Sequence, residues 1–284
     1  MSRLRTAYQF SRRYTGRVKA VILDWSGTTA DKYVIAPAVV FAHVFEKAGV
    51  PISMSEAREP MGIRKDLHIA TICNNPSVRQ RWFNAKGRYP NQGDVEEMYK
   101  NYIPAQLECL PKYTDLIPGA AKSIKTLRDG YGIKVGSTTG FSRPMVDILV
   151  EGARKQGLDF DATVAGDEVI NGSRPKPFMI YKNMDLMNVH PIQSVIKVDD
   201  TTSGVGEALE AGCWGVGVAR YSNYMDINSF EEEENYTREE IEARTEKSKQ
   251  KLRETGVHYV IDSIAELPAV VEDINERLAR GEQP

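Results

Sequence analysis

The stretch Val-Lys-Ala-Val-Ile-Leu-Asp-Trp-Ser-Gly-Thr-Thr, residues 18–29, decides how the rest of the chain is interpreted. Its first half is apolar apart from Lys19 and predicts a buried strand. Asp24 follows this strand directly, and a Gly-Thr turn comes next. An acid at this point suits a carboxylate directed into a crevice, although a turn-forming Asp is the simpler interpretation of the motif alone.

Five further short runs resemble this first strand and are separated by helical patterns. They lie at 133–137, 162–165, 195–198, 216–219 and 259–261. Apolar strands that alternate with helices predict an α/β fold, with a Rossmann-like parallel sheet core and helices on both faces. Ligands of such sheets bind beyond the carboxyl ends of the strands, so the residues just after each run are the candidates for chemistry.

Residues 37–115 interrupt this alternation. Pro37 can begin a helix with an apolar face, and Gly49 can end it. Ser53 and Glu56 have the spacing of a capping box ahead of another helix. We therefore expect an inserted all-helical cap at 37–115, on a core formed by 18–36 and 116–284. The charged stretch at 230–255 predicts a single solvated helix.

The composition limits the partners of the chain. Its 284 residues include 37 Lys and Arg and 39 Asp and Glu, for a formal net charge of −2. Nucleic-acid binders need an excess of basic charge, so we expect no nucleic-acid partner. The apolar stretch at 33–45 is too short to span a bilayer, so we expect no membrane insertion.

The compartment can be inferred from the cysteines and from the N-terminus. Three widely spaced cysteines without metal-ligand spacing suit free thiols in a reducing compartment such as the cytoplasm. Residues 1–17 form a basic N-terminal arm with five arginines and no acid. An organelle transit peptide, for example a mitochondrial one, has a similar composition and is the alternative to a plain arm.

Polar residues follow three of the predicted strands. The segment Gly-Ser-Thr-Thr-Gly at 136–140 offers hydroxyls and backbone N–H groups ahead of a helix that Ser142 can open, which favours an anion site. The segment Arg-Pro-Lys-Pro at 174–177 offers a fixed cation. Asp200 brings a second carboxylate, and two carboxylates beside a phosphoryl group favour Mg²⁺.

This ordered set resembles the haloacid dehalogenase superfamily, over nearly the whole chain from residue 18 to about 274. The resemblance implies that Asp24 attacks phosphorus and forms an aspartyl phosphate. It also implies two sets of binding residues: Thr138, Thr139, Gly140 and Arg174 for the phosphoryl group, and Asp24, the backbone carbonyl of Ser26, and Asp200 for Mg²⁺. Lys176 is the second choice, after Arg174, for the cation.

Ser26 departs from the pattern of the phosphate-ester phosphatases in this superfamily, which have a second Asp at that position. That Asp protonates the departing alkoxide, and a hydroxyl is far too weak an acid to replace it near neutral pH. Either the leaving group is activated in another way or the protein is inactive.

The cap sequence offers another way. If the stretch from Met61 is helical, Met61, Lys65 and His68 share one face. On a partly apolar face the pKa of Lys65 would fall, so that its amine could form a Schiff base while His68 moves protons. The simpler interpretation is a surface Lys and His on an amphipathic helix.

With its motifs Asp-Trp-Ser-Gly-Thr-Thr, Pro-Met-Gly-x-x-Lys-x-x-His and Gly-Ser-Thr-Thr-Gly, the chain resembles the phosphonoacetaldehyde hydrolase (phosphonatase) family. The resemblance implies hydrolysis of the carbon–phosphorus bond of a small-molecule phosphonate, phosphonoacetaldehyde, to acetaldehyde and phosphate. Lys65 would form the Schiff base, with Met61 and His68 as its partners in the cap. A homodimer joined through the cap is also implied, and the stripe Phe41, Val44 and Phe45 could serve it or could be cap core.

Three positions depart from this family. Some members have Cys where Val34 stands and Tyr where Phe141 stands. Gly204 replaces the acid expected four residues after Asp200, a loss for which Asp199 could compensate. The alternatives are a phosphatase or phosphomutase acting on phosphate esters, a non-catalytic binder of a phosphorylated ligand, and a hydrolase of a substituted phosphonoaldehyde.

Overall fold

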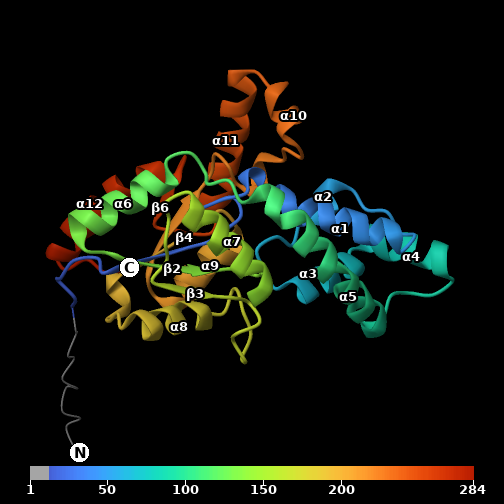
Figure 1. The fold of residues 1–284 in the computed structure, drawn as a ribbon, viewed down its shortest axis with the longest axis horizontal. Coiled ribbons are helices and arrows are strands. Elements are labelled where there is room, and N and C mark those ends of the chain that lie inside the picture. The colour runs from blue at the N-terminus through green and yellow to red at the C-terminus, as the bar shows by residue number, and fades with distance from the viewer. Residues whose placement is uncertain (1–12) are drawn as a thin grey trace, which may run out of the picture.

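The computed structural model describes residues 13–284, which contain a six-stranded sheet flanked by helices (Figure 1). The strands are β1 (Ala20–Leu23), β2 (Lys134–Thr138), β3 (Ala162–Val164), β4 (Val195–Asp199), β5 (Trp214–Val218) and β6 (Tyr259–Ile261). Their order across the sheet is β3-β2-β1-β4-β5-β6, and every neighbouring pair is parallel. The α/β prediction is confirmed, since all six predicted runs form strands with ends shifted by at most two residues.

The chain changes direction across the sheet at β1. It runs from β1 outward through β2 to β3 and then returns to β4 on the other side of β1. Leu23, the last residue of β1, pairs with Ser137 of β2 and with Val198 of β4. Because these three residues are in register, the residues that follow them reach the same edge of the sheet. This is the switch point at which open α/β sheets bind ligands.

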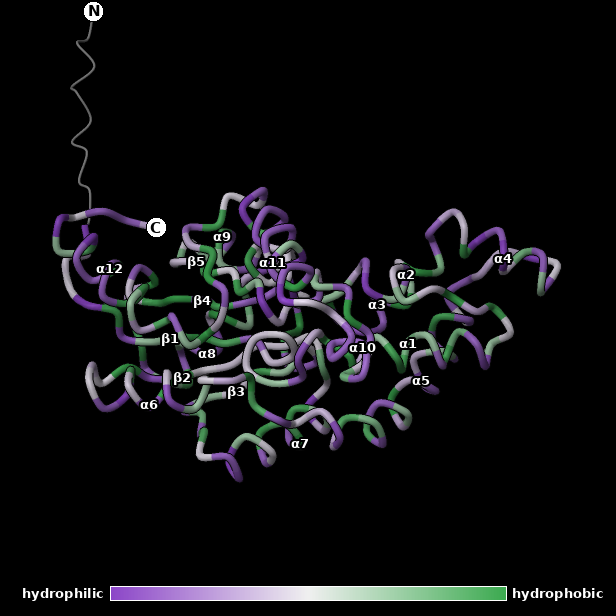
Figure 2. The backbone as a smooth tube through the Cα atoms, turned by 90° about the horizontal axis from the view of Figure 1, so that it is seen from above, coloured by the Kyte–Doolittle hydropathy of each residue, from purple (hydrophilic) through white to green (hydrophobic). Residues whose placement is uncertain are grey.

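Helices cover both faces of the sheet. One face packs against α6 (Ala120–Tyr131), α7 (Arg143–Lys155) and α12 (Leu267–Ala279), and the other against α8 (Phe178–Met187), α9 (Thr202–Ala211) and α11 (Arg238–Arg253). Figure 2 shows α6 and α7 on one side of the strands and α9 and α11 on the other. Alternate residues of β1 serve the two cores, since Val21 faces the first set of helices and Ile22 faces the second.

The helices between residues 35 and 109 gather at one end of the molecule (Figure 1). We call them the cap helices: α1 (Ile35–Lys47), α2 (Met54–Arg58), α3 (Lys65–Asn74), α4 (Pro76–Lys86) and α5 (Gln92–Cys109). The stripe Phe41, Val44 and Phe45 is buried here, so it is core of the cap helices. The inserted helical unit is confirmed, while the boundaries at 37 and 115 stay a prediction.

Short 3-10 helices complete the described residues: η1 (Lys32–Val34), η2 (Leu110–Tyr113), η3 (Ile192–Ser194), η4 (Asn223–Met225) and η5 (Ile264–Glu266). The prediction of one solvated helix over 230–255 is wrong. The segment forms α10 (Phe230–Glu234) and α11, which begins after Thr237 with a capping box to Glu240. One face of α11 is buried, because it packs against β5 and β6.

Residues 1–12 of the basic arm predicted at 1–17 lie outside the described residues. The alternative interpretation of this arm, a transit peptide, falls largely on the same residues. Across residues 13–284, no helix is both long enough and apolar enough to traverse a lipid bilayer.

Candidate active site

The carboxyl ends of β1, β2 and β4 meet the cap helices around a small cavity. Its lining consists of Asp24, Ser26, Pro37, Met61, Gly62, Lys65, Thr139, Gly140, Phe141, Arg174, Asp200 and Thr201. Every site residue predicted from the sequence lines this cavity except Thr138 and His68. Residues up to 176 positions apart therefore come together as the strand register requires.

Asp24 lies at the base of the cavity and is almost fully buried. Its N–H donates to the carbonyl of Val198, and its own carbonyl accepts from the hydroxyl of Thr29 at 2.6 Å. These backbone bonds fix the carboxylate at the end of β1. Its Oδ1 lies 2.7 Å from Nη2 of Arg174, so the predicted nucleophile and the predicted cation are in direct contact.

A carboxylate oxygen from each of Asp24, Asp199 and Asp200 lies within 4.8 Å of the other two. Asp199 is held firmly, because Lys197 Nζ lies 2.6 Å from its Oδ2 and Thr201 donates to its Oδ1. Asp200 accepts at Oδ2 from the N–H of Asn223 at 2.7 Å. Its Oδ1 is buried and has no partner among the described residues.

Two glycines make room for these carboxylates. Gly27 has φ +80°, and a Cβ there would lie 2.4 Å from Oδ2 of Asp200. A Cβ on Gly204 would lie 1.9 Å from Cγ of Asp199. The structure thus gives a physical reason for the missing acid at 204, since the carboxylate of Asp199 already fills that space.

Negative charge exceeds positive charge at this edge of the sheet. The buried acids are Asp24, Asp199, Asp200 and Glu207, and the buried cations are Arg174 and Lys197 beside them and Lys65 across the cavity. Burial and then the charge of Asp24 raise the pKa of Asp200 well above its usual value. Burial, and to a smaller extent the negative charge of Asp199, raises the pKa of Asp24. Excess carboxylate charge and an unpaired buried oxygen fit a hard divalent cation.

The segment after β2 that is predicted to bind a phosphoryl group lines the cavity only in part. Thr139 and Gly140 line the cavity. The hydroxyl of Thr138 instead lies 2.7 Å from Arg174 Nη2 and 3.2 Å from a carboxylate oxygen of Glu207. Thr138 therefore contacts the site only through Arg174, which Glu207 also binds at Nε. The first N–H of α7, on Arg143, is bonded to Asp167 and is not free for an anion.

Lys65 enters the same cavity from the cap helices, as the first residue of α3. Its side chain is buried, and no carboxylate among residues 13–284 lies within ion-pair distance of its Nζ. The amine lies 4.6 Å from the centre of the Phe141 ring. Burial lowers the pKa of Lys65 to about 8, against an opposing effect of Asp24.

Met61 and His68 differ from their predicted arrangement. Met61 is not helical, because α3 begins only at Lys65 and Gly62 turns the chain with φ +96°. Met61 still lines the cavity. His68 is fully buried behind Lys65, with Nε2 2.8 Å from the carbonyl of Ala57 and its ring stacked on Phe41. Burial and the charge of Lys65 lower its pKa well below the usual value, so the ring is neutral.

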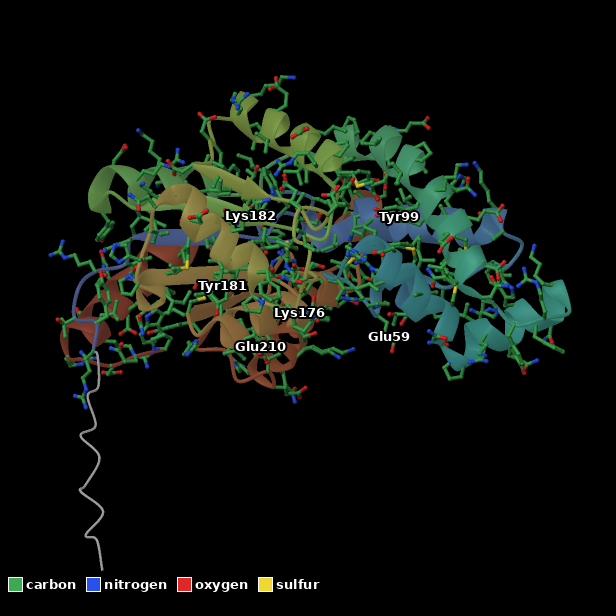
Figure 3. All side chains as sticks on the ribbon, turned by 90° about the horizontal axis from the view of Figure 1, so that it is seen from below. Glu59, Tyr99, Lys176, Tyr181, Lys182 and Glu210 are labelled. Atoms are coloured by element: carbon green, nitrogen blue, oxygen red, sulfur yellow. The ribbon has the colours of Figure 1, made fainter. Side chains whose placement is uncertain are left out.

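Lys176, the second choice for the fixed cation, lies outside the site. Its Nζ donates to the carbonyl of Asn171 at 2.9 Å, and the side chain is exposed. Figure 3 shows it on the same side of the core as Tyr181 of α8 and Glu210 of α9. Of the two predicted cations, Arg174 is therefore the one that lines the cavity. Burial lowers the pKa of Arg174, but the acids around it outweigh this effect and keep the pKa above the usual value.

Comparison with known proteins places the chain. Residues 21–218 match the haloacid dehalogenase-like hydrolase family. Relatives named phosphonoacetaldehyde hydrolase in Syntrophobacter fumaroxidans and Paraburkholderia phytofirmans are 38% and 40% identical, over 95% and 94% of this chain and 97% and 99% of theirs. The chain belongs to the phosphonoacetaldehyde hydrolase family. It is an enzyme of the haloacid dehalogenase-like hydrolases.

The fold of this phosphonoacetaldehyde hydrolase family member also has a close structural counterpart. The crystal structure of a phosphonoacetaldehyde hydrolase-like protein from Oleispira antarctica superposes with a TM-score of 0.92 at 36% identity. The superposition covers 98% of this chain and 99% of the other. The likeness thus includes both the sheet and the cap helices.

The two side chains that depart from some phosphonoacetaldehyde hydrolases both lie close to the cavity. Phe141 offers the face of its ring to the amine of Lys65. Val34 packs on Met61 and Ala38, with its backbone in the left-handed region at φ 56°. The rings that lie near the amine of Lys65 are those of Phe141 and Phe41, with centres 4.6 Å and 5.8 Å from its Nζ.

Proposed function

We propose that the chain hydrolyses the carbon–phosphorus bond of phosphonoacetaldehyde to acetaldehyde and phosphate. The observation that supports this most is the position of Lys65. A buried amine with a pKa of about 8 and no carboxylate partner in the described residues lines the same cavity as Asp24. A lysine kept for its charge alone would be expected to pair with an acid.

In the first step the free amine of Lys65 adds to the aldehyde carbon. The oxygen then takes one proton from the amine and a second from solvent, and leaves as water. The product is a protonated iminium that joins the substrate to α3. The apolar surroundings, with Phe141 on one side, favour the neutral amine that must attack. His68, neutral and with a buried Nδ1 that has no partner in the described chain, is the nearby base of the cap for the proton lost by the amine.

In the second step a carboxylate oxygen of Asp24 attacks phosphorus. The electron pair of the carbon–phosphorus bond moves to carbon and on into the iminium, which becomes an enamine. Asp24 now carries the phosphoryl group as an aspartyl phosphate. This route explains why Ser26 suffices where phosphate-ester phosphatases need an acid, because no alkoxide leaves.

In the last steps a proton returns to the enamine carbon, and water releases acetaldehyde from Lys65. A second water hydrolyses the aspartyl phosphate and frees phosphate. Arg174 and the backbone around Thr139 and Gly140 bind the phosphoryl oxygens. We further propose that Mg²⁺ is held by Asp24, the carbonyl of Ser26, and Asp200, where it would offset the charge of the transferring group.

Reductive trapping tests the role of Lys65. Borohydride added with phosphonoacetaldehyde, or with acetaldehyde, should convert the iminium to a stable secondary amine that peptide mass spectrometry finds on Lys65. Lys65→Arg should abolish both the adduct and turnover, since a guanidinium stays protonated. Lys176→Arg is the control, because that lysine lies outside the cavity. Full turnover by Lys65→Arg would instead favour a phosphatase acting on phosphate esters.

We also propose a homodimer joined through the cap helices. Phe41 and Phe45 of the stripe on α1 cannot provide the contact, because they are fully buried within the chain. A large groove remains on the cap between α1, α4 and α5, lined by His43, Lys47, Trp82 and Met98 among others. Light scattering on the full chain measures the assembly directly, and a monomeric mass at micromolar concentration would refute it.

A further inference from the structure

Arg58 joins the cap helices to the core at a place outside the reaction cavity. It is the last residue of α2 and is 4% exposed. Figure 3 marks the position through its neighbour Glu59, where the cap helices meet the core. A buried arginine is costly unless every donor is satisfied, so its partners indicate what it is for.

Within residues 13–284, the side chain of Arg58 makes four hydrogen bonds, and all four go to residues outside the cap helices. Nη1 donates to the carbonyl of Tyr33 at 2.6 Å and to Oδ1 of Asn223 at 3.2 Å. Nη2 donates to the carbonyl of Ile227 at 2.6 Å, and Nε to Oδ1 of Asn228 at 3.0 Å. One guanidinium thus binds both the linker that precedes α1 and the segment that follows β5.

Asn223 extends this contact to the predicted metal ligands. Its side-chain NH₂ donates back to the carbonyl of Arg58 at 3.1 Å, which closes a reciprocal pair. Its backbone N–H donates to Oδ2 of Asp200 at 2.7 Å. That bond occupies Oδ2 and leaves Oδ1 of Asp200 buried and without a partner among the described residues, so the position of Asn223 helps to set the orientation of this carboxylate.

The linker held by Arg58 is strained. Asp31, Tyr33 and Val34 have φ values of 51°, 64° and 56°, and a β-branched residue such as Val34 rarely adopts this region. Strain of this kind persists only where surrounding contacts impose it. The bond from Arg58 to the carbonyl of Tyr33 is one such contact, and it links the strained linker to the same guanidinium.

We propose that Arg58 is a positioning residue that couples docking of the cap helices to the orientation of Asp200. When α2 is docked, Arg58 anchors Asn223, and Asn223 holds Asp200 for metal binding. When α2 separates from the core, Asn223 loses its anchor and the linker at 31–34 relaxes. This proposal rests on the proposed function only for the identity of the metal as Mg²⁺.

A double-mutant cycle in Mg²⁺ affinity tests the coupling. Calorimetry with Mg²⁺ alone, on the substrate-free full chain, should give a dissociation constant at least fivefold higher for Arg58→Gln than for the wild type. In an Asn223→Ala background, the same substitution should add less than a twofold change, because the link is already absent. Arg81→Gln is the matched control, since its ion pair with Glu56 stays within the cap helices.

Hydrogen exchange gives a readout that does not depend on the metal. The peptides that contain Tyr33 and Asn223 should exchange faster than in the wild type in Arg58→Gln and in Asn228→Ala. Their exchange rates should be unchanged in Arg81→Gln. The Asn228→Ala variant retains the arginine and so serves if Arg58→Gln folds poorly. Equal exchange in all variants, or an Arg58→Gln effect on Mg²⁺ binding that is the same in both backgrounds, would overturn the coupling. A wild type that binds no Mg²⁺ would contradict the metal assignment, while the exchange data would still decide the role of Arg58.

Discussion

The reactivity of Lys65 toward aldehydes should follow a titration with a midpoint near pH 8. Burial lowers its pKa from 10.5 to about 8. About a tenth of the amine is then free at pH 7, half at pH 8 and about nine-tenths at pH 9. A lysine that kept the value of 10.5 would be free at only about 0.03% at pH 7, so Lys65 should react about 300-fold faster than such a lysine on this ground alone.

Removing the charge of Asp24 shows whether the cavity sets this value. Asp24 opposes the effect of burial, because its negative charge favours the ammonium form of Lys65. Asp24→Asn should therefore move the midpoint below 8. Asp66→Asn is the matched control, since Asp66 follows Lys65 in the sequence but pairs with Arg64. That substitution should leave the midpoint unchanged.

The assay is single-site labelling across a pH series. The protein is mixed briefly with acetaldehyde and cyanoborohydride between pH 6 and 10, and mass spectrometry reports the occupancy of Lys65 at each pH. A midpoint near 10.5 would refute the argument from burial. An equal shift in Asp24→Asn and Asp66→Asn would refute the assignment of the opposing charge to Asp24.

Three further predictions concern stability and metal binding. Lys65→Met should raise the melting temperature at pH 7, because it removes an amine whose pKa is lower in the folded state than in the unfolded state. Burying the charged amine costs up to about 3 kcal/mol of folding free energy. This cost is fully present below pH 8 and fades toward pH 10.5. A lower melting temperature would contradict this. Gly204→Ala should weaken Mg²⁺ binding in calorimetry, because its Cβ would collide with Asp199, whereas Gly130→Ala, with open space around it, should bind normally. EDTA should abolish turnover and Mg²⁺ restore it, and full activity after exhaustive chelation would exclude a metal requirement.

The sheet and most of the cavity could be predicted from local sequence. Each strand is a short apolar run, and in a parallel sheet the residues after such runs must meet at one edge. Asp24, Thr139 and Asp200 follow from this rule. The rule says nothing about side chains that reach the site sideways. Glu207 lies on α9, and Lys197 lies within β4, so neither had a positional signal.

The errors have a common physical cause, which is tertiary contact. Met61 fits a helical stripe by spacing, but Gly62 turns the chain so that its backbone can approach Thr201 and Ser203, where a Cβ would lie within 2.4 Å of both hydroxyls. Thr138 follows the pattern of a phosphate-binding hydroxyl, but Glu207 and Arg174 bind it first. No local pattern reports partners that lie 36 or more positions away.

The chemistry of Lys65 and the docking of the cap helices depend on each other. Burial is the largest cause of the lowered pKa of Lys65, and part of that burial comes from the core, through Phe141 and the floor of the cavity. Lifting α3 from the core would return the amine to water and raise its pKa toward 10.5. Docking of the cap helices onto the core favours the free amine of Lys65. By linkage, protonation of Lys65 must therefore disfavour docking by the same free energy. Arg58, which binds the core without lining the cavity, contributes docking energy that offsets this opposition below pH 8.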